Sequence, residues 1–427
     1  MSTARSLWVR GRRIVLGEII AIGNELTSGR ISNTTSGFAA RHLFEGGHEI
    51  YAMHTIGDTP DLIGEALLRA IGRVDFVVVT GGLGSTDDDM TNEAVSKALG
   101  RPTIPNLDIL YRIRAHLDKN SAPAMNSLEK LAWLPEGADP LNSGEKMAGY
   151  QLIHDDTLIF FLPGIPYQMR ILLVNHVLPR LRQWHDARQL DTLQRVYKIF
   201  PMDEVEVNRR VTELSLPEQI HIGYYPVFPE IHLSITYRGE GEQDPDELFR
   251  EACSRIEAEL GDSLYGSNRD TMASIVGDLC SRHNIRLVFA ESCTGGLISQ
   301  MITDVAGSSS YFLGGVVSYA NSMKEDLVGV ERTILEQHGA VSRQCAAAMA
   351  EGVLKASGGD LSLSVTGIAG PGGGTAEKPV GTVYMGLADI KGTVVHRFNF
   401  SGKRTTIRKL TAHTGLDLIR TTLLKRE

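Results

Sequence analysis

The sequence repeats one pattern in two separate regions: a short apolar run, a turn rich in glycine, and then a helical segment. FVVVTGGLGSTDDDMTNEAVSKAL, from Phe76, shows the pattern in the first region, and IRLVFAESCTGGLISQMI, from Ile285, shows it in the second. LSLSVTGIAGPGGG, from Leu361, is a further apolar run that ends in glycines. Strands that alternate with helices form parallel sheets with helices on both faces. The chain is therefore predicted to be an α/β protein.

Its 427 residues are enough for two or three domains. We predict two α/β domains, at residues 14–175 and 267–427, and treat them as unrelated because they share no repeat that can be aligned. Residues 176–266 are predicted to form a small α+β module between them. In this module RVYKIF and HLSITYRG alternate as strands do, and PDELFREACSRIEAELGD is an amphipathic helix. In the first domain, Asn33 or Thr34 can cap a helix that ends at Gly46 and Gly47.

The composition is that of a soluble cytoplasmic protein. A net charge of −8 gives no sign of a general affinity for nucleic acid or for an anionic membrane. No apolar run approaches the ~20 residues needed to span a bilayer. The basic start, from Arg5 to Arg13, lacks a long apolar region, so we expect a flexible leader and no targeting signal. The four cysteines form no C-x-x-C pair, which favours reduced thiols over a disulfide framework or a zinc site.

Polar and glycine-rich turns follow two apolar runs of the third domain. Ligands in open α/β sheets bind beyond the carboxyl ends of the strands. Residues 291–296, ESCTGG, follow one run, and their backbone N–H groups and hydroxyls could hold an anion. Residues 366–374 follow the other, where glycine lets the backbone approach a ligand closely. Neither is a P-loop. A single glycine cluster of this kind is as common in a tight turn as in a binding site. Two such clusters at strand ends in one domain favour a ligand site.

Residues 307–324, GSSSYFLGGVVSYANSMK, carry the parts of a hydroxyl nucleophile with a lysine base. A partly desolvated lysine can remove the proton of a serine, and Tyr319 could relay that proton or hold Lys324 in place. The same residues also suit a serine-rich helix cap, a strand tyrosine half in the core, and a surface lysine. Spacing alone favours this second, structural interpretation.

Five motifs together resemble the C-terminal domain of the competence/damage-inducible CinA family. They are ESCTGG, GSSSYFLGGVVSYAN with its following lysine, EQHGAVS, SVTGIAGPGGG and EKPVGTVY, in this order. The resemblance implies a nicotinamide mononucleotide (NMN) amidohydrolase, which converts NMN and water to nicotinate mononucleotide and ammonia without a cofactor. It implies that Ser309 is the nucleophile, with Tyr319 and Lys324 as its activating pair. The implied substrate-binding residues are Ser292, Thr294, Gly295, Thr366, Gly367 and Arg404.

Arg404 is expected to hold the substrate phosphate or to polarise the carboxamide, although Lys403 and Arg408 suit the same anion. A Tyr/Lys oxidoreductase is rejected, because short-chain dehydrogenases space the two residues as Y-x-x-x-K and place their glycine motif before the tyrosine. The alternative that remains is a non-catalytic regulator that senses nucleotides. The Ser309, Tyr319 and Lys324 set argues against it, because a sensor needs no nucleophile.

GEIIAIGNELTSGRISNTT, VVVTGGLGSTDDDMT and LPGIPYQM resemble the N-terminal domain of the same family, which is related to molybdopterin-binding domains. The resemblance implies an ADP-ribose pyrophosphatase that needs a divalent metal ion (Mg²⁺, Mn²⁺ or Co²⁺). Asp88 and Asp89 are the expected metal ligands, although acids here also favour the positive end of the following helix. Ser85 and Gln168 depart from the usual proline and glutamate. The expected nucleotide site comprises Glu25, Asn33, Gly81, Gly82, Gly84, Thr86 and Thr91.

The middle module stands where the family has a KH-like module. KH domains that grip RNA use a G-x-x-G loop, and the sequence between Arg195 and Gly266 has none. The acidic residues between Glu240 and Glu247 also oppose nucleic acid. We therefore expect a spacer or dimer-forming role for the module, small nucleotides (NMN, and also ADP-ribose) as ligands, no nucleic-acid partner, and a twofold homodimer.

Overall fold

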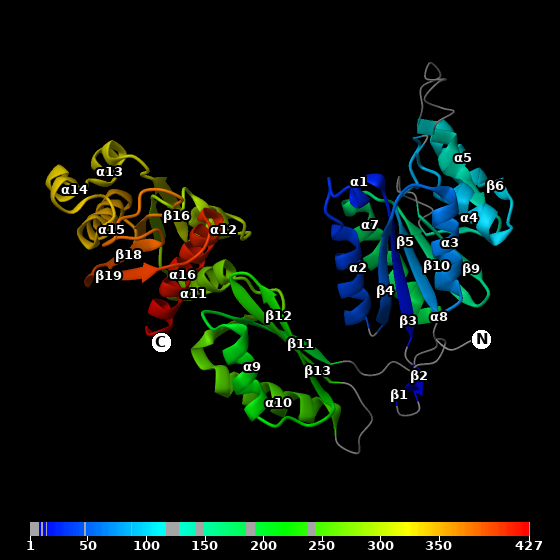
Figure 1. Ribbon diagram of the computed structural model, residues 1–427, viewed down its shortest axis with the longest axis horizontal. Coiled ribbons are helices and arrows are strands. Elements are labelled where there is room, and N and C mark those ends of the chain that lie inside the picture. Colours follow the sequence, from blue (N-terminus) through cyan, green and yellow to red (C-terminus); the bar gives the residue numbers. More distant parts are fainter. Residues whose placement is uncertain are drawn as a thin grey trace. The chain divides into compact units, whose positions relative to one another are not determined.

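The structure is a computed structural model that describes residues 8–9, 12–13, 15–46, 48–86, 88–116, 128–141, 149–184, 193–237 and 244–426 (Figure 1). The described residues fall into two compact units, and the chain first passes from one to the other between Leu193 and Gln194. The first unit holds one α/β sheet, and the second holds a small α+β module followed by another α/β sheet. The predicted fold class is confirmed. No helix in the described part of the chain is long and apolar enough to cross a membrane.

The central sheet of the first unit has the strand order β4-β3-β5-β10-β9-β8. Its strands are β3 (Leu16–Ile22), β4 (Glu49–Ile56), β5 (Phe76–Thr80), β8 (Asp139–Pro140), β9 (Tyr150–His154) and β10 (Thr157–Leu162). β4, β3, β5 and β10 are parallel, as the repeated pattern predicts. β9 and β8 add an antiparallel edge. Every residue of β3, β5 and β10 is buried, because helices cover both faces of the sheet.

The helices of the first unit form two apolar cores, one on each face of its sheet. Ile63 and Leu67 of α3 pack with Val79 on one face, and Leu43 of α2 and Met169 of α7 pack with Val78 on the other. Outside the central sheet, the described elements of this unit are β1 (Trp8–Val9), β2 (Arg12–Arg13), α1 (Asn24–Thr27), α2 (Thr34–Glu45), α3 (Pro60–Ile71), α4 (Thr91–Leu99), β6 (Thr103–Pro105), α5 (Leu107–His116), η1 (Lys130–Ala132), β7 (Trp133–Pro135), α7 (Pro166–Leu172), η2 (Leu173–Val177) and α8 (Leu178–Trp184).

Two local predictions can be compared with the structure. Asn33 is the residue that caps α2, since its Oδ1 accepts a hydrogen bond of 3.1 Å from the Ser36 N–H, and Gly46 follows the last helical residue. The predicted boundary at residue 175 falls inside the helical stretch from α7 to α8. Val177 and Leu181 of that stretch are fully buried in the core of the first unit, so this domain extends to Trp184.

The small module of the second unit is an antiparallel sheet with two helices. Its strand order is β12-β13-β11-β14. The elements are β11 (Gln194–Ile199), α9 (Glu204–Glu213), β12 (Ile220–Val227), β13 (Glu230–Tyr237), α10 (Pro245–Leu260), η3 (Gly261–Ser263) and β14 (Leu264–Ser267). The module therefore has the α+β fold that the alternating strands and the amphipathic helix predict.

The C-terminal sheet has the strand order β16-β15-β17-β18-β19, with β16, β15 and β17 parallel and the rest antiparallel. Helices α11, α12 and α16 contribute to the core on one face, and α13, α14 and α15 to the core on the other. The elements are α11 (Met272–His283), β15 (Leu287–Glu291), α12 (Leu297–Thr303), η4 (Ser308–Ser310), β16 (Phe312–Val317), α13 (Asn321–Val328), α14 (Arg332–His338), α15 (Arg343–Ser357), β17 (Leu361–Gly367), β18 (Thr382–Asp389), β19 (Gly392–Asn399) and α16 (Arg404–Leu424).

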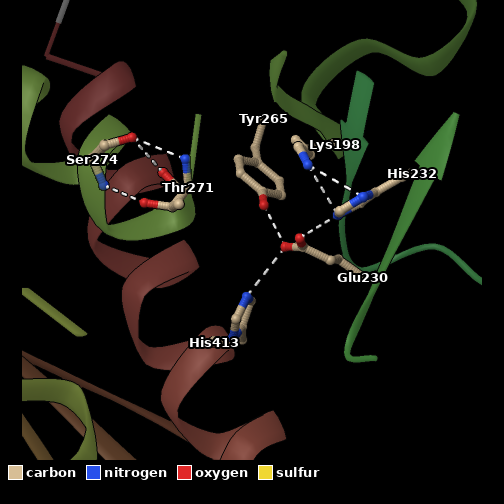
Figure 2. Close-up of polar contacts among 7 residues, drawn as sticks. All are labelled: Lys198, Glu230, His232, Tyr265, Thr271, Ser274 and His413. Carbon is tan, nitrogen blue, oxygen red and sulfur yellow. Dashed lines mark hydrogen bonds and ion pairs between the residues drawn. The ribbon is translucent and has the colours of Figure 1, made fainter. Parts of the chain in front are cut away.

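A polar cluster joins the small module to the C-terminal domain, and Glu230 is its centre (Figure 2). The Glu230 carboxylate accepts a hydrogen bond from the Tyr265 hydroxyl and lies 2.6 Å from His232 Nε2. Its other contact is with α16, where His413 Nε2 lies 3.3 Å away. Burial raises the pKa of Glu230, but the hydrogen bonds from His232, His413 and Tyr265 outweigh burial and hold the pKa well below its usual range. The same view shows the capping box in which Thr271 and Ser274 begin α11.

Candidate functional site

Lys324, in the first turn of α13, is the most unusual side chain of the C-terminal domain. Only 1% of its surface is exposed. Its Nζ donates to Ser318 O at 2.6 Å and to Tyr319 O at 3.1 Å, and lies 3.1 Å from Ser292 Oγ. Burial lowers the pKa of Lys324, and in the described part of the chain no carboxylate pairs with it to offset that effect. The surface lysine favoured by spacing alone is therefore wrong: Lys324 is a buried amine beside a hydroxyl.

Ser292 reaches Lys324 from the carboxyl end of β15. Its N–H donates to Val365 O at 2.9 Å, which ties the turn to β17. Its hydroxyl is close enough to a lysine of lowered pKa to exchange a proton with it. Ser318, at the end of β16, is also buried, and its Oγ has no hydrogen-bond partner among the described residues. Ser318 was not among the residues predicted for the site, although its place at a strand end was a usable signal.

The turn after β15 binds an anion, but that anion is its own glutamate. The fully buried Glu291 carboxylate accepts hydrogen bonds from the N–H groups of Gly296 (3.0 Å), Ile298 (3.1 Å) and Ser299 (2.8 Å), and from Ser299 Oγ (2.7 Å). These are the N–H groups at the start of α12, which would otherwise be free to bind a phosphate. The expectation that this backbone holds a ligand anion is therefore corrected. Gly295, in the same turn, has the left-handed φ of +61° that its position requires.

Two arginines from the start of α16 reach the same end of the sheet. Arg404 donates to Gly370 O at 2.8 Å and to the Tyr319 hydroxyl at 3.1 Å. Arg408 donates to Thr294 O at 2.5 Å. Tyr319 is 61% exposed, which differs from the half-buried strand tyrosine of the structural interpretation. Tyr319 and Arg404 thus lie together beside the glycine turn that follows β17.

Two of the expected binding residues, Thr366 and Gly367, have roles within the fold, and a third, Thr294, is buried. The Thr366 hydroxyl donates to Ala340 O at 2.8 Å, so it is already engaged. A side chain on Gly367 would place its Cβ 2.7 Å from a Val383 methyl, so glycine is needed there for packing. Thr294 is fully buried, and its Oγ1 has no hydrogen-bond partner in the part of the chain that the structure describes.

Ser309 lies at the other end of the sheet. It belongs to η4, which precedes β16, and the parallel pairing of β16 with β15 places Phe312 beside Leu287 and Val317 beside Glu291. Ser309 is therefore next to the start of β15, whereas Ser292 and Lys324 are at its end. At a rise of about 3.3 Å per residue, β16 separates the two groups by roughly 17 Å. Within one chain, the structure does not bring Ser309 to Lys324.

The first unit has a cavity of about 420 Å³ at the carboxyl ends of its parallel strands. Glycine turns follow β5 and β10 there, and Gly81 (φ +104°) has no room for a side chain because a Cβ would lie 2.2 Å from Ile22 O. Ser85 and Gln168 also line the cavity, as does Asp58, which the sequence analysis did not identify. The expected nucleotide or metal residues that line it are Glu25, Gly81, Gly82, Gly84, Asp88 and Asp89.

The other three expected residues do not line the cavity and make hydrogen bonds within the fold. Asn33 caps α2, and the Thr91 hydroxyl donates to Gly81 O at 3.0 Å. The Thr86 N–H and hydroxyl both donate to Asp89 Oδ2, at 3.0 and 2.5 Å. Among the described residues, which omit Asp87, no group of three or more His, Cys, Asp or Glu side chains is arranged to hold a metal ion. Asp88 and Asp89 line one cavity, and one or two carboxylates together with substrate phosphates suit Mg²⁺.

Comparison with known protein families accounts for most of the chain. Residues 269–423 match the model of the CinA C-terminal domain, residues 18–183 that of a probable molybdopterin binding domain, and residues 194–266 that of the damage-inducible protein CinA KH domain.

Individual relatives match along nearly the full length. A CinA-like protein of Desulfotalea psychrophila is 58% identical over 408 residues, which cover 96% of this chain and 99% of that protein. A CinA-like protein of Geobacter sulfurreducens is 37% identical over 407 residues, 95% of this chain and 98% of that protein. The crystal structure of competence/damage inducible protein CihA from Agrobacterium tumefaciens is 41% identical and aligns with a TM-score of 0.35, covering 36% of this chain and 93% of that one.

Proposed function

The chain belongs to the CinA family, and from this premise we propose that its C-terminal domain is an amidohydrolase that converts NMN to nicotinate mononucleotide and ammonia. The proposal draws on the five motifs that the domain shares with the family. The single observation that supports it best is the buried amine of Lys324, 3.1 Å from the Ser292 hydroxyl and bonded to two backbone carbonyls.

Lys324 is the base of the proposed reaction. A lysine is useful as a base only when it is neutral near the working pH, and burial lowers its pKa in that direction. Lys324 removes the proton of a serine hydroxyl, and the serine oxygen attacks the carboxamide carbon of NMN. The protonated lysine then gives that proton to the departing amide nitrogen, which leaves as ammonia.

Water completes the cycle. It attacks the resulting serine ester, releases nicotinate mononucleotide, and restores the serine hydroxyl. The N–H groups of the glycine turn after β17 are the proposed donors to the oxyanion, and one such donor is typically worth about 3 kcal/mol. The motifs assign the nucleophile to Ser309, whereas the hydroxyl next to Lys324 in one chain is that of Ser292. Because β16 separates Ser309 from Lys324, we propose Ser292 as the serine that this base activates.

Arg404 is the proposed partner of the NMN phosphate. It is exposed, it lies beside the glycine turn, and Tyr319 holds its guanidinium by a hydrogen bond of 3.1 Å. Arg408 and Lys403 add positive charge at the start of the 21-residue helix α16, where the helix dipole favours an anion. Because Glu291 already fills the start of α12, the phosphate is assigned to α16.

Release of ammonia from NMN by the full-length protein, measured with no added metal, tests the proposal. Wild-type protein should release ammonia and nicotinate mononucleotide in equal amounts, and Lys324→Ala should not. Tight binding of NMN without ammonia release would instead support the alternative, a regulator that senses the nucleotide.

We further propose that the first unit cleaves ADP-ribose to AMP and ribose 5-phosphate. The observation that favours this second activity is the cavity of about 420 Å³ lined by Gly81, Gly82, Asp88 and Asp89. Asp88 and Asp89 would hold Mg²⁺, Mn²⁺ or Co²⁺, and the ion would neutralise the pyrophosphate charge. Failure of ADP-ribose to yield AMP with each of the three ions would remove this proposal and leave the first one standing.

A further inference from the structure

We propose that Lys130 supplies the positive charge that binds the pyrophosphate of a nucleoside diphosphate in the cavity of the first unit. The inference rests on the proposed cleavage of ADP-ribose in that cavity. It goes further in naming the side chain that holds the phosphates of the substrate, a residue that the sequence motifs do not single out.

The charge of the cavity wall is the first observation that carries the inference. Glu25, Asp58, Asp88 and Asp89 all line the cavity, and no Lys, Arg or His is among the described residues that line it. A divalent ion held by Asp88 and Asp89 would offset the charge of two carboxylates. A pyrophosphate brings further negative charge, so its binding calls for another cation at the edge of the cavity.

Lys130 places its amine at that edge. It is the first residue of η1, and the residue after it, Leu131, lines the cavity. Lys130 Nζ donates a hydrogen bond of 3.2 Å to Thr86 O. Thr86 lies between Ser85 and Asp88 in the chain, and both of these line the cavity. The amine is therefore next to the loop that carries the expected metal ligands.

Hydrogen bonds within this loop hold it in shape. The Thr86 N–H and hydroxyl both donate to Asp89 Oδ2, at 3.0 and 2.5 Å. A side chain on Gly84 would place its Cβ 2.3 Å from the same oxygen, so the loop closes tightly around Asp89. Lys130 is also close enough to Asp88 for the two charges to interact. The amine thus lies beside a defined loop, where a phosphate bound to the metal ion would be within its reach.

Most of the hydrogen-bonding capacity of the Lys130 ammonium group is open to a phosphate. The group has three N–H donors, and among the described residues, which omit Asp87, Thr86 O is its one acceptor. The neighbouring acid does not offset its charge, since Glu129 is paired with Arg114 at 2.8 Å. A lysine with donors to spare is a common ligand of phosphate groups.

The backbone under Lys130 is anchored to the rest of the unit. Ala132, at the end of η1, is fully buried, and its carbonyl accepts a hydrogen bond of 2.8 Å from the Asn106 N–H. The next carbonyl, that of Trp133, accepts one of 3.1 Å from the Asn92 side chain. Lys130 itself is half-buried. Its amine is therefore positioned before a ligand arrives, which lowers the entropy cost of holding a phosphate.

Steady-state cleavage of ADP-ribose by full-length protein with saturating Mg²⁺ tests the inference. Lys130→Met removes the charge but keeps a long side chain. It should raise KM for ADP-ribose about 10- to 100-fold, with a smaller effect on kcat, because a hydrogen bond to a charged group is lost. Lys130→Arg keeps the charge and should recover most of the affinity. Lys97→Met is the matched control, because Lys97 is exposed and pairs with Asp61. An unchanged KM in Lys130→Met would overturn the inference.

A binding measurement separates contact with the phosphates from support of the loop. ADP carries a pyrophosphate and adenosine carries none, so calorimetric titration of both ligands in the presence of Mg²⁺ isolates the effect of charge. Lys130→Met should weaken ADP binding about 10- to 100-fold and leave adenosine binding at the wild-type level. Equal weakening of both ligands would mean that Lys130 only supports the loop through Thr86 O, and would also overturn the inference.

If wild-type protein cleaves no ADP-ribose, the proposed pyrophosphatase activity fails and the titration with ADP decides the inference alone. ADP should then bind wild-type protein at least about tenfold more tightly than it binds Lys130→Met. That result would keep Lys130 as the phosphate contact of a binding site. Equal affinities, or no binding of ADP to wild-type protein, would rule this contact out.

Discussion

Ser309 stands before β16 and Lys324 follows it, so one six-residue strand separates the serine and the lysine that the motifs pair. Lys324 is instead bonded to Ser292 in its own chain. Ser292 is therefore the serine within reach of Lys324, and Ser309→Ala should affect ammonia release much less than Ser292→Ala does.

The pH dependence of ammonia release should reflect Lys324. Burial lowers its pKa below the ordinary 10.5, and only the neutral amine can accept a proton. The rate should therefore rise as pH rises and level off once Lys324 is deprotonated, with a midpoint below 10.5. Lys324→Arg should be inactive at every pH, because arginine keeps its proton. The control Lys355→Arg, at an exposed position near the end of α15, should keep the wild-type profile. A rate that falls across this range would contradict the role of Lys324 as base.

Arg404 should contribute more to binding of the NMN phosphate than to hydrolysis of the amide. Loss of a charge-assisted hydrogen bond typically costs about 1.5–3 kcal/mol, so Arg404→Ala should raise KM for NMN about 10- to 100-fold with a smaller effect on kcat. Nicotinamide riboside lacks the phosphate, so its turnover should be nearly unaffected by Arg404→Ala. Arg332→Ala is the matched control, since Arg332 is exposed on α14 and pairs with Glu336 of the same helix. Equal losses with both substrates would place Arg404 at the carboxamide.

Glu291→Gln should destabilise the C-terminal domain while leaving every proposed reacting group in place. The carboxylate accepts four hydrogen bonds at the start of α12, and an amide offers one acceptor oxygen in place of two. The expected loss is about 2 kcal/mol, because buried N–H groups are left without acceptors. Thermal unfolding followed by circular dichroism should show the midpoint fall by several degrees. An unchanged midpoint would mean that water replaces the carboxylate.

Glu230 should hold the small module on the C-terminal domain in a way that depends on pH. Its pKa is held below the usual value, so it contributes stability above pH 4.5, and that stability is lost as pH falls through the lowered pKa. Glu230→Gln should therefore lower the unfolding midpoint at pH 7, by the equivalent of about 2 kcal/mol. The difference from wild type should shrink as pH is lowered below 4. Glu206→Gln removes an exposed ion-pair partner on α9 and should change the midpoint much less.

Gly82→Ala should impair the first unit. Gly82 has φ +66°, and a Cβ there would lie 2.2 Å from Thr91 Oγ1. The loop must shift, so AMP formation from ADP-ribose should be lost and the unfolding midpoint lowered. Gly29→Ala is the matched control, because Gly29 has a similar φ of +70° with open space around it. It should show the backbone strain alone and keep the activity. Equal loss in both variants would show that backbone strain alone accounts for the effect.

Local signals in the sequence were sufficient for most of the fold. Asn33 before an apolar helical face and Gly46 after it predict the ends of α2 within a residue, because capping depends on neighbours in the chain. The fully buried β5 follows from an unbroken apolar run. The antiparallel β9 was missed, because its tight turn at Asp155 and Asp156 carries neither glycine nor proline.

The site was harder to predict, because its contacts join residues far apart in the chain. In the sequence, Glu291 is one of several polar residues in a predicted turn. Only the fold shows that its carboxylate accepts hydrogen bonds from the backbone N–H groups at the start of α12. In the sequence, Lys324 has the spacing of a surface lysine. Only the fold shows that three oxygens from the ends of two strands surround its amine. The separation of Ser309 from Lys324 had a visible signal, since a predicted strand lies between them, but only strand pairing gives its direction.

The occupied start of α12 has a consequence for how the C-terminal site works. Because Glu291 accepts four hydrogen bonds at the end of the turn that carries Ser292 and Thr294, we expect this turn to be ordered before substrate arrives. Such preorganisation means that little binding energy is diverted into ordering the protein. Substrate analogues should therefore bind with little change in hydrogen exchange at residues 291–299, and the selectivity of the site should reside in its shape.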